Sequence, residues 1–148
     1  MPDRRRARAA LDAAVAPHRT HPTPRPVAGW VRAVRDALGM STRDLAARMG
    51  VASSSWVSEL ERNEAAGTVT LATLERAAAA LGCRLEYVLV PVEPLEEVVR
   101  TRARDVARRE LSDVEHTMAL EAQPVDLGDR VEDRAAQLVD RRGLWADR

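Results

Sequence analysis

The sequence predicts a mostly α-helical protein with one β-strand and a C-terminal helical arm. Along most of the 148 residues, apolar side chains recur every three or four positions, as on one face of an amphipathic helix. Alanine, leucine and valine dominate, whereas there are three Trp, one Tyr and no Phe, which favours thin helical layers over a thick sheet core. Strict alternation occurs in one stretch, residues 83–90, and predicts the strand.

The first 26 residues are expected to combine an arginine-rich helix with a proline-rich linker. Residues 3–16 contain helix-forming residues and predict a short, loosely attached helix. Residues 17–26 (PHRTHPTPRP) contain four prolines, which remove backbone donors and oppose helix. We therefore expect an extended linker that ends where the folded body begins, near Val27.

Four short helices are expected in residues 27–82. The first follows the spacing of apolar residues from Trp30 to Leu38, and Ser41 can cap the second. The third opens in Ser53–Ser55, and Thr70 can cap the fourth. The apolar side chains expected to face inward are Leu45, Ala46, Met49, Val57, Leu60, Leu71, Leu74, Ala78 and Leu81.

Residues 83–92 are expected to form a single strand that pairs two copies of the chain. Leu85, Tyr87 and Leu89 alternate with Arg84 and Glu86 before Pro91 ends the pattern. A lone strand leaves its own backbone groups unpaired. Pairing with the same strand of a second copy would satisfy them and give a two-fold homodimer.

Residues 93–148 are expected to form an acidic helical arm. Pro94 and the acidic residues after it suit a first helical turn, and the apolar stripe continues to about Gln123. Asp126 can cap a last helix that ends near Gly143.

The segment Met40–Glu64 predicts DNA binding. It contains two short helices, a tight turn at Gly50 and a second helix that opens with serines, which is the arrangement of a repressor-type helix-turn-helix. Serine can bind phosphates or base edges, glutamate can accept from cytosine, and arginine suits phosphate. The residues expected to contact double-stranded DNA, in an inverted-repeat operator, are Arg43, Ser53, Ser54, Ser55, Ser58, Glu59 and Arg62.

Charge and composition limit the other functions that can be expected of the protein. Residues 1–92 carry 13 arginines and 9 acidic residues, whereas residues 93–148 carry 10 arginines and 14 acidic residues. This difference indicates either that the two parts of the chain have different functions or simply that the C-terminal helices are acidic and soluble. One cysteine excludes an internal disulfide, and no apolar run is long enough to span a membrane, so we expect the cytoplasm. No nucleophile–base set, metal-ligand cluster or phosphate-binding loop is recognisable, so no enzyme activity, metal or cofactor is expected.

The segments GWVRAVRDALGMS, TLATLERAAAALGCRLEYVLVP and HTMALEAQ occur in order, and with the helix pair they resemble the mobile mystery protein A family. That resemblance covers nearly the whole chain. It implies an Xre-like transcriptional regulator, encoded beside a Fic-domain protein that transfers AMP to a target hydroxyl. It further implies an antitoxin that binds this partner and represses the shared operon.

The same resemblance implies an inhibitory motif in Thr117–Glu121. Fic inhibitors carry the pattern [ST]-x-x-x-E-[GN], and this chain matches it through Glu121 but has Ala122 at the last position. The glutamate would pair with the arginine that holds the ATP γ-phosphate. The pattern is short, since Ser55 and Glu59 also fit its start, and Glu121 alternatively reads as a solvated carboxylate at a helix end.

Two departures leave alternatives open. The interval from Gly50 to Val57 is one residue longer than in the usual Xre-type pattern, so the serine that enters the groove is not assigned. Glu59 repels phosphate. The alternatives are a protein-only inhibitor of a Fic enzyme with little DNA binding, and a stand-alone Xre-like repressor without a toxin partner.

Overall fold

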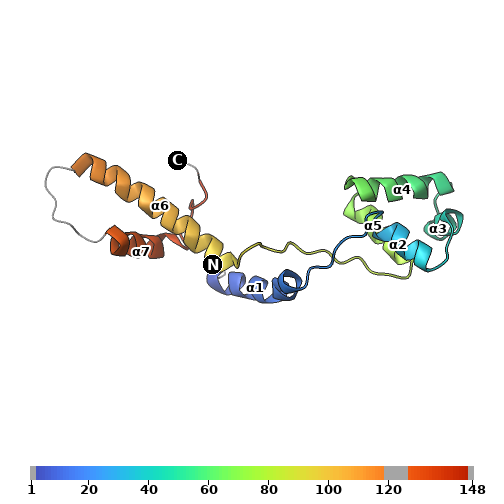
Figure 1. The fold of residues 1–148 in the computed structure, drawn as a ribbon, viewed down its shortest axis with the longest axis horizontal. Coiled ribbons are helices and arrows are strands. Elements are labelled where there is room, and N and C mark those ends of the chain that lie inside the picture. Colours follow the sequence, from blue (N-terminus) through green and yellow to red (C-terminus); the bar gives the residue numbers. More distant parts are fainter. Residues whose placement is uncertain (1–2, 119–126, 147–148) are drawn as a thin grey trace. The chain divides into compact units, whose positions relative to one another are not determined.

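The computed structural model describes residues 3–118 and 127–146, with side chains described for 3–112 and 128–146. Seven α-helices occur in these ranges (Figure 1). The chain divides into two compact units, one made of Met1–Pro22 and Leu89–Arg148 and the other of Thr23–Val88. We call them the outer-segment unit and the helix-turn-helix unit.

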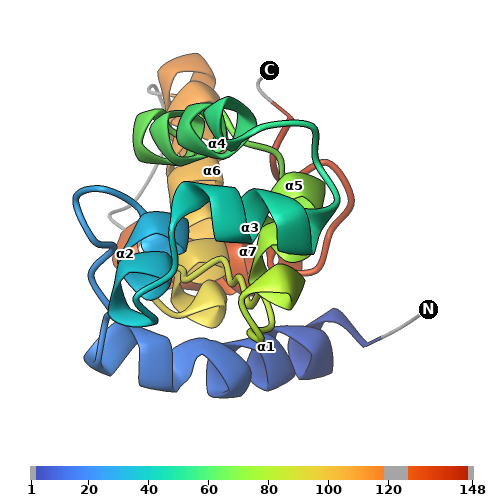
Figure 2. The same cartoon turned by 90° about the vertical axis from the view of Figure 1, so that its right-hand side faces the viewer.

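The helix-turn-helix unit contains four helices around one core (Figure 2). They are α2 (Trp30–Ala37), α3 (Thr42–Met49), α4 (Ser54–Ala66) and α5 (Leu71–Ala80). The sequence therefore predicted these helices correctly, but Leu71 is 47% exposed instead of facing inward, and Ala77 is fully buried. The buried core residues are Val31, Leu45, Ala46, Val57, Leu60, Ala77 and Leu81.

The start of α3 is held by a reciprocal cap. The Ser41 hydroxyl accepts from the Asp44 N–H at 3.1 Å, and the Asp44 carboxylate accepts from the Ser41 N–H at 2.9 Å. The Ser41 hydroxyl also donates to Asp44 at 2.5 Å, and these bonds lower the pKa of Asp44. The predicted role of Ser41 as a cap is confirmed.

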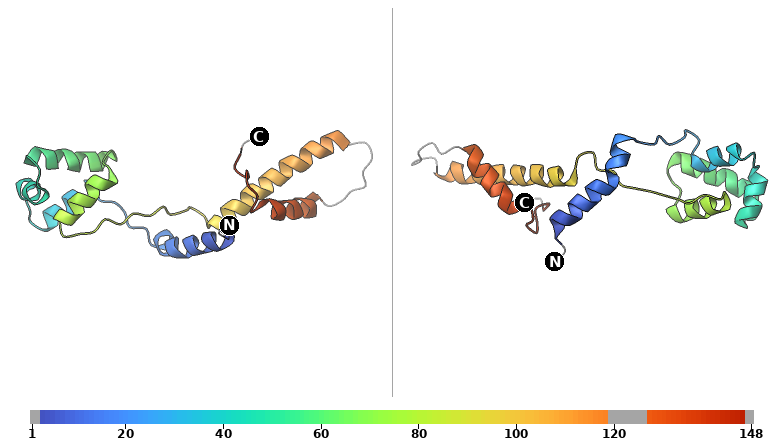
Figure 3. Two further views of the ribbon diagram at one scale, coloured as in Figure 1. Left: turned by 180° about the vertical axis from the view of Figure 1, so that it is seen from behind. Right: turned by 90° about the horizontal axis from the view of Figure 1, so that it is seen from below.

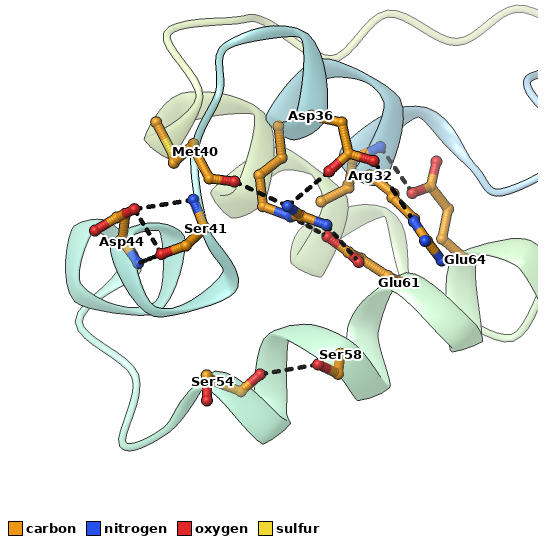
Figure 4. Close-up of polar contacts among 11 residues, drawn as sticks. Arg32, Asp36, Met40, Ser41, Asp44, Ser54, Ser58, Glu61 and Glu64 are labelled. Carbon is orange, nitrogen blue, oxygen red and sulfur yellow. Dashed lines mark hydrogen bonds and ion pairs between the residues drawn. The ribbon is translucent and has the colours of Figure 1, made fainter.

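A buried ion pair joins α4 to α2. Arg35 of α2 donates from Nε and Nη2 to the two carboxylate oxygens of Glu61, at 2.6 and 3.1 Å (Figure 4). Its Nη1 donates to the Met40 carbonyl at 2.8 Å. The bond to Glu61 raises the pKa of Arg35, and both side chains are about nine-tenths buried.

A second carboxylate of α4 caps the start of α2. Glu64 accepts from the backbone N–H groups of Trp30 and Val31 at 2.6 and 2.9 Å, which satisfies donors that a helix start leaves free. Gly29 makes room for it: its φ is +86°, and a Cβ there would lie 2.7 Å from the Glu64 carboxylate. Arg25 donates to the carbonyls of Glu64 and Ala65, at the end of α4.

The predicted dimer strand is wrong. Residues 83–90 form no strand, and all regular structure in the described residues is helical. Leu85 is half-buried, whereas Tyr87 and Leu89 are 69% and 87% exposed. Alternation of apolar and polar residues suits a strand, but a strand also needs a neighbour, and none of the described residues supplies one.

The outer-segment unit contains α1 (Arg4–Thr20), α6 (Leu95–Met118) and α7 (Leu127–Leu138). Figure 3 shows α7 alongside α6, and the two helices bury the small residues Ala103, Ala107 and Ala135 between them. The predicted arm helices are thus confirmed in the described ranges. Thr117 lies within α6, whereas Glu121 and Ala122 lie outside the described residues.

The N-terminal helix differs from its prediction in length and attachment. It continues through Pro17, because proline has a helical φ and the Pro17 carbonyl still accepts from His21 N–H at 2.9 Å. It is also firmly attached: Asp12 accepts from the Leu95 N–H at 2.8 Å, and Arg8 pairs with Glu96 at 2.7 Å. Among the helices described, none combines the length and the apolar character needed to cross a membrane.

We expect Gly29→Ala to destabilise the helix-turn-helix unit by about 3 kcal/mol. The new side chain is strained at positive φ and displaces Glu64, which leaves two backbone donors unpaired. Urea unfolding followed by far-UV circular dichroism measures the loss. Gly67→Ala is the matched control, since Gly67 has φ +75° but open space around it, and should cost about 1 kcal/mol. Equal losses, with unchanged amide exchange at Val31, would contradict the cap.

We expect Ser41→Ala to raise the pKa of Asp44 by removing its hydroxyl partner. In the parent protein the lowered pKa means that the Asp44 carboxylate stabilises the fold above its ordinary pKa of about 3.9. This contribution is lost as the pH falls through the lower, folded-state pKa. Carboxyl-carbon NMR titration of both proteins measures the change, with Ser58→Ala as the control. An identical Asp44 pKa in parent and Ser41→Ala would refute this assignment.

Candidate nucleic-acid interface

The helix pair α3–α4 has the turn that the sequence predicted. Gly50 has φ +67°, a left-handed conformation that glycine adopts without strain, and its N–H closes the end of α3 on the Ala47 carbonyl. The turn runs from Gly50 to Ser53, and α4 starts at Ser54. The additional residue between Gly50 and Val57 is therefore accommodated within this turn and the first turn of α4.

One face of α4 is open to solvent. Ser55, Ser58, Glu59 and Arg62 are all exposed and recur at spacings of three and four, so they form one stripe. The opposite side of the helix buries Val57 together with Leu60, Glu61 and Glu64. Val57 and Leu60 thus face inward as predicted, and Ser55, Ser58 and Glu59 are exposed, but Ser54, predicted on the same outward face, is half-buried. We call Ser55, Ser58, Glu59 and Arg62 the open face.

The serine hydroxyls differ in their bonding. The Ser58 hydroxyl donates to the Ser54 carbonyl at 3.2 Å, one turn earlier, and so presents its lone pairs outward (Figure 4). Ser53 and Ser55 are exposed, with their hydroxyls 3.4 Å apart, while Ser54 is half-buried. Ser55 and Ser58 are thus the serines best placed for a base edge, and Ser53 for a phosphate beside the helix start.

The N-terminus of α4 is also free to bind an anion. Ser53 occupies the N-cap position, but its side chain makes no capping bond. The Trp56 N–H donates to the Ser53 carbonyl at 3.2 Å, which leaves the N–H groups of Ser54 and Ser55 at the helix start, where the helix dipole adds partial positive charge. A DNA phosphate satisfies both features.

Arg43 and Arg62, the two arginines predicted to bind phosphate, differ in their hydrogen bonding. Arg43 is exposed near the start of α3 and makes no hydrogen bond or ion pair with any described residue. Arg62, on the open face, donates from Nε to the Ser58 carbonyl at 3.4 Å, a long bond that leaves the remaining guanidinium N–H groups available. Glu59 lies between them in sequence and is exposed, without a described partner.

Sequence reasoning did not identify the residues that orient the open face. Glu61 and Glu64 occupy the inner side of α4, where their charge is matched by Arg35 and by the start of α2. Their spacing of three, in phase with Val57 and Leu60, was the available signal. The predicted dimer residues Leu85, Tyr87 and Leu89 lie outside the open face and in no strand.

Comparison with known proteins agrees with this geometry. Residues 31–88 match the family model described as Helix-turn-helix, which spans α2 to α5 and the segment after them. No curated protein and no solved structure matches the chain. The chain therefore contains an Xre-like helix-turn-helix domain, the type of domain found in DNA-binding regulators.

Proposed function

We propose that this protein is a sequence-specific DNA-binding regulator of transcription, not an enzyme. The observation that carries the proposal is the open face of α4, which follows a left-handed glycine turn and is held outward by two buried carboxylates. A single α-helix fits the major groove of B-DNA. Ser55, Ser58 and Glu59 then meet base edges, while Arg43 and the start of α4 meet phosphates.

The recognition chemistry favours particular bases. A carboxylate accepts from the N4 amino group of cytosine, so Glu59 selects a C·G pair where it reaches the groove floor. Serine hydroxyls are less selective because they donate and accept. The helix-turn-helix unit has eight arginines against seven acidic residues in Thr23–Val88, so its electrostatic attraction to DNA is modest.

Because one helix-turn-helix unit attracts DNA only modestly, we propose that two copies of the chain bind DNA together. Two copies on an inverted repeat, with half-sites about one DNA turn apart, would double the contacts and supply the predicted homodimer. The predicted strand pairing is no part of this proposal.

We expect the full chain to shift DNA from the region upstream of its own gene in a salt-sensitive gel-shift assay. For each tenfold rise in salt concentration, the logarithm of the binding constant should fall by about 0.9 for every DNA phosphate that the protein neutralises. Selection from randomised DNA then defines the site. Glu59→Gln should move one preferred pair from C·G towards A·T, because an amide pairs with adenine.

Glu86→Gln is the matched control for that variant, because it removes an exposed carboxylate outside the open face. It should leave the selected sequence unchanged. Absence of any salt-sensitive shift by the parent would overturn the regulator function. An unchanged preference in Glu59→Gln would remove Glu59 from base reading but leave the function standing.

We also propose that the protein is the antitoxin of a Fic-domain AMP-transferase. What supports this is the match of Thr117 and Glu121 to the inhibitory pattern, in the context of the family resemblance, together with the acidic balance of residues 93–148. Glu121 would bind the arginine that otherwise holds the ATP γ-phosphate. A protein that serves both roles would repress the operon and inhibit the enzyme.

We expect Glu121→Gly to restore AMP transfer by a co-expressed Fic partner encoded beside the gene. Labelled ATP measures the transfer, and co-purification checks that the partner is still bound. Glu115→Gly, in the same helical arm, is the control and should inhibit like the parent. Full inhibition by Glu121→Gly would exclude the motif, without bearing on DNA binding.

A further inference from the structure

Most arginines of the helix-turn-helix unit make a bond within the protein, although Arg62 keeps guanidinium N–H groups available. The unit contains no lysine, so its eight arginines are its only permanent cations. Six of them bond to described residues, either to a carboxylate or to a backbone carbonyl, and Arg43 and Arg76 do not. The engaged arginines are Arg25, Arg32, Arg35, Arg48, Arg62 and Arg84.

Arg76 makes no such bond, but its position is restrained by a contact with Trp56. Its guanidinium carbon lies 5.9 Å from the centre of the Trp56 ring, the distance of a cation–π contact. Trp56 is itself half-buried against the core, so its ring is a fixed support. Arg76 is exposed on α5 and makes no hydrogen bond or ion pair with the residues described. Its charge is therefore positioned and unneutralised.

Trp56 sits at the border of the open face. It directly follows Ser55 in the first turn of α4 and precedes Glu59 by three positions. At about 100° per residue, its side chain points between the open face and the buried side. Its ring supports a residue of α5, so Arg76 is held beside the open face on the α5 side. Arg43 belongs to α3, a different helix.

We propose that Arg76, supported by Trp56, binds a phosphate of the DNA backbone when α4 enters the groove. This inference rests on the proposed DNA-binding function and adds a contact that the sequence pattern did not indicate. A stacked guanidinium keeps its N–H groups directed outward and loses little further freedom when it meets a phosphate. Arg43 and Arg76 then contact the backbone from two helices, one before and one after α4.

The test measures binding of the full chain to its selected DNA by fluorescence anisotropy at several salt concentrations. Arg76→Met should weaken binding about tenfold at low salt, equally for different DNA sequences, and reduce the salt slope by about 1. Arg84→Met is the matched control: it removes an arginine paired with Glu86 and should leave the slope unchanged. Thermal unfolding confirms that each variant is folded.

A second variant tests the role of the ring. Trp56→Leu keeps the charge of Arg76 but removes its support, so binding should weaken a few-fold while the salt slope stays the same. A parent-like affinity and slope in Arg76→Met would overturn the phosphate contact while the regulator function stands. If the parent protein itself shows no salt-sensitive binding, both the function and this contact fail.

Discussion

The contact between α4 and α2 is the constraint on which the candidate interface depends. Glu61 and Glu64 are both buried, and each makes two hydrogen bonds to α2. Glu61 accepts both of its bonds from the Arg35 guanidinium, and Glu64 accepts both of its bonds from backbone N–H groups at the start of α2. Two bidentate contacts one turn apart fix the rotation of α4 about its own axis as well as its distance. Apolar packing alone is less specific about rotation, because its contacts have no preferred direction. The open face therefore faces outward as a consequence of charges on the opposite side of the same helix.

This arrangement explains why a DNA-reading unit can have so little net charge. Arg35 is fully occupied by Glu61, Asp36 and the Met40 carbonyl, and removing Arg35 would leave the charge of Glu61 buried without compensation. Most other arginines hold helix ends or exposed carboxylates, as Arg25 and Arg48 illustrate. Few cations remain for phosphate, so selectivity must come from base edges and from accurate placement of those few. A total of charges, read from the sequence, cannot separate the arginines that hold the fold from those that face outward.

The local chemistry of helix starts and turns was predictable, whereas features that need a partner were not. Ser41, Thr70 and Gly50 act as the sequence indicated, because caps and left-handed turns depend on nearby residues. The strand at residues 83–92 failed because pairing depends on a second segment. The buried role of Glu64 was missed for a related reason: its partners, Trp30 and Val31, lie more than thirty positions away. The open face was predictable because Val57 and Leu60 fix the inner side of α4.

The order of the two units along the chain separates the proposed roles. The helix-turn-helix unit lies between the two parts of the outer-segment unit, whose helices α1 and α6 are joined by the Asp12 cap and the Arg8–Glu96 pair. The family match is confined to the inserted unit and does not reach α1, α6 or α7. DNA reading is therefore attributable to residues 31–88 without reference to the outer segments. The proposed antitoxin role of Thr117 and Glu121 belongs instead to the outer-segment unit, in which residues 93–148 are acidic but Met1–Pro22 is basic, with five arginines against two acidic residues.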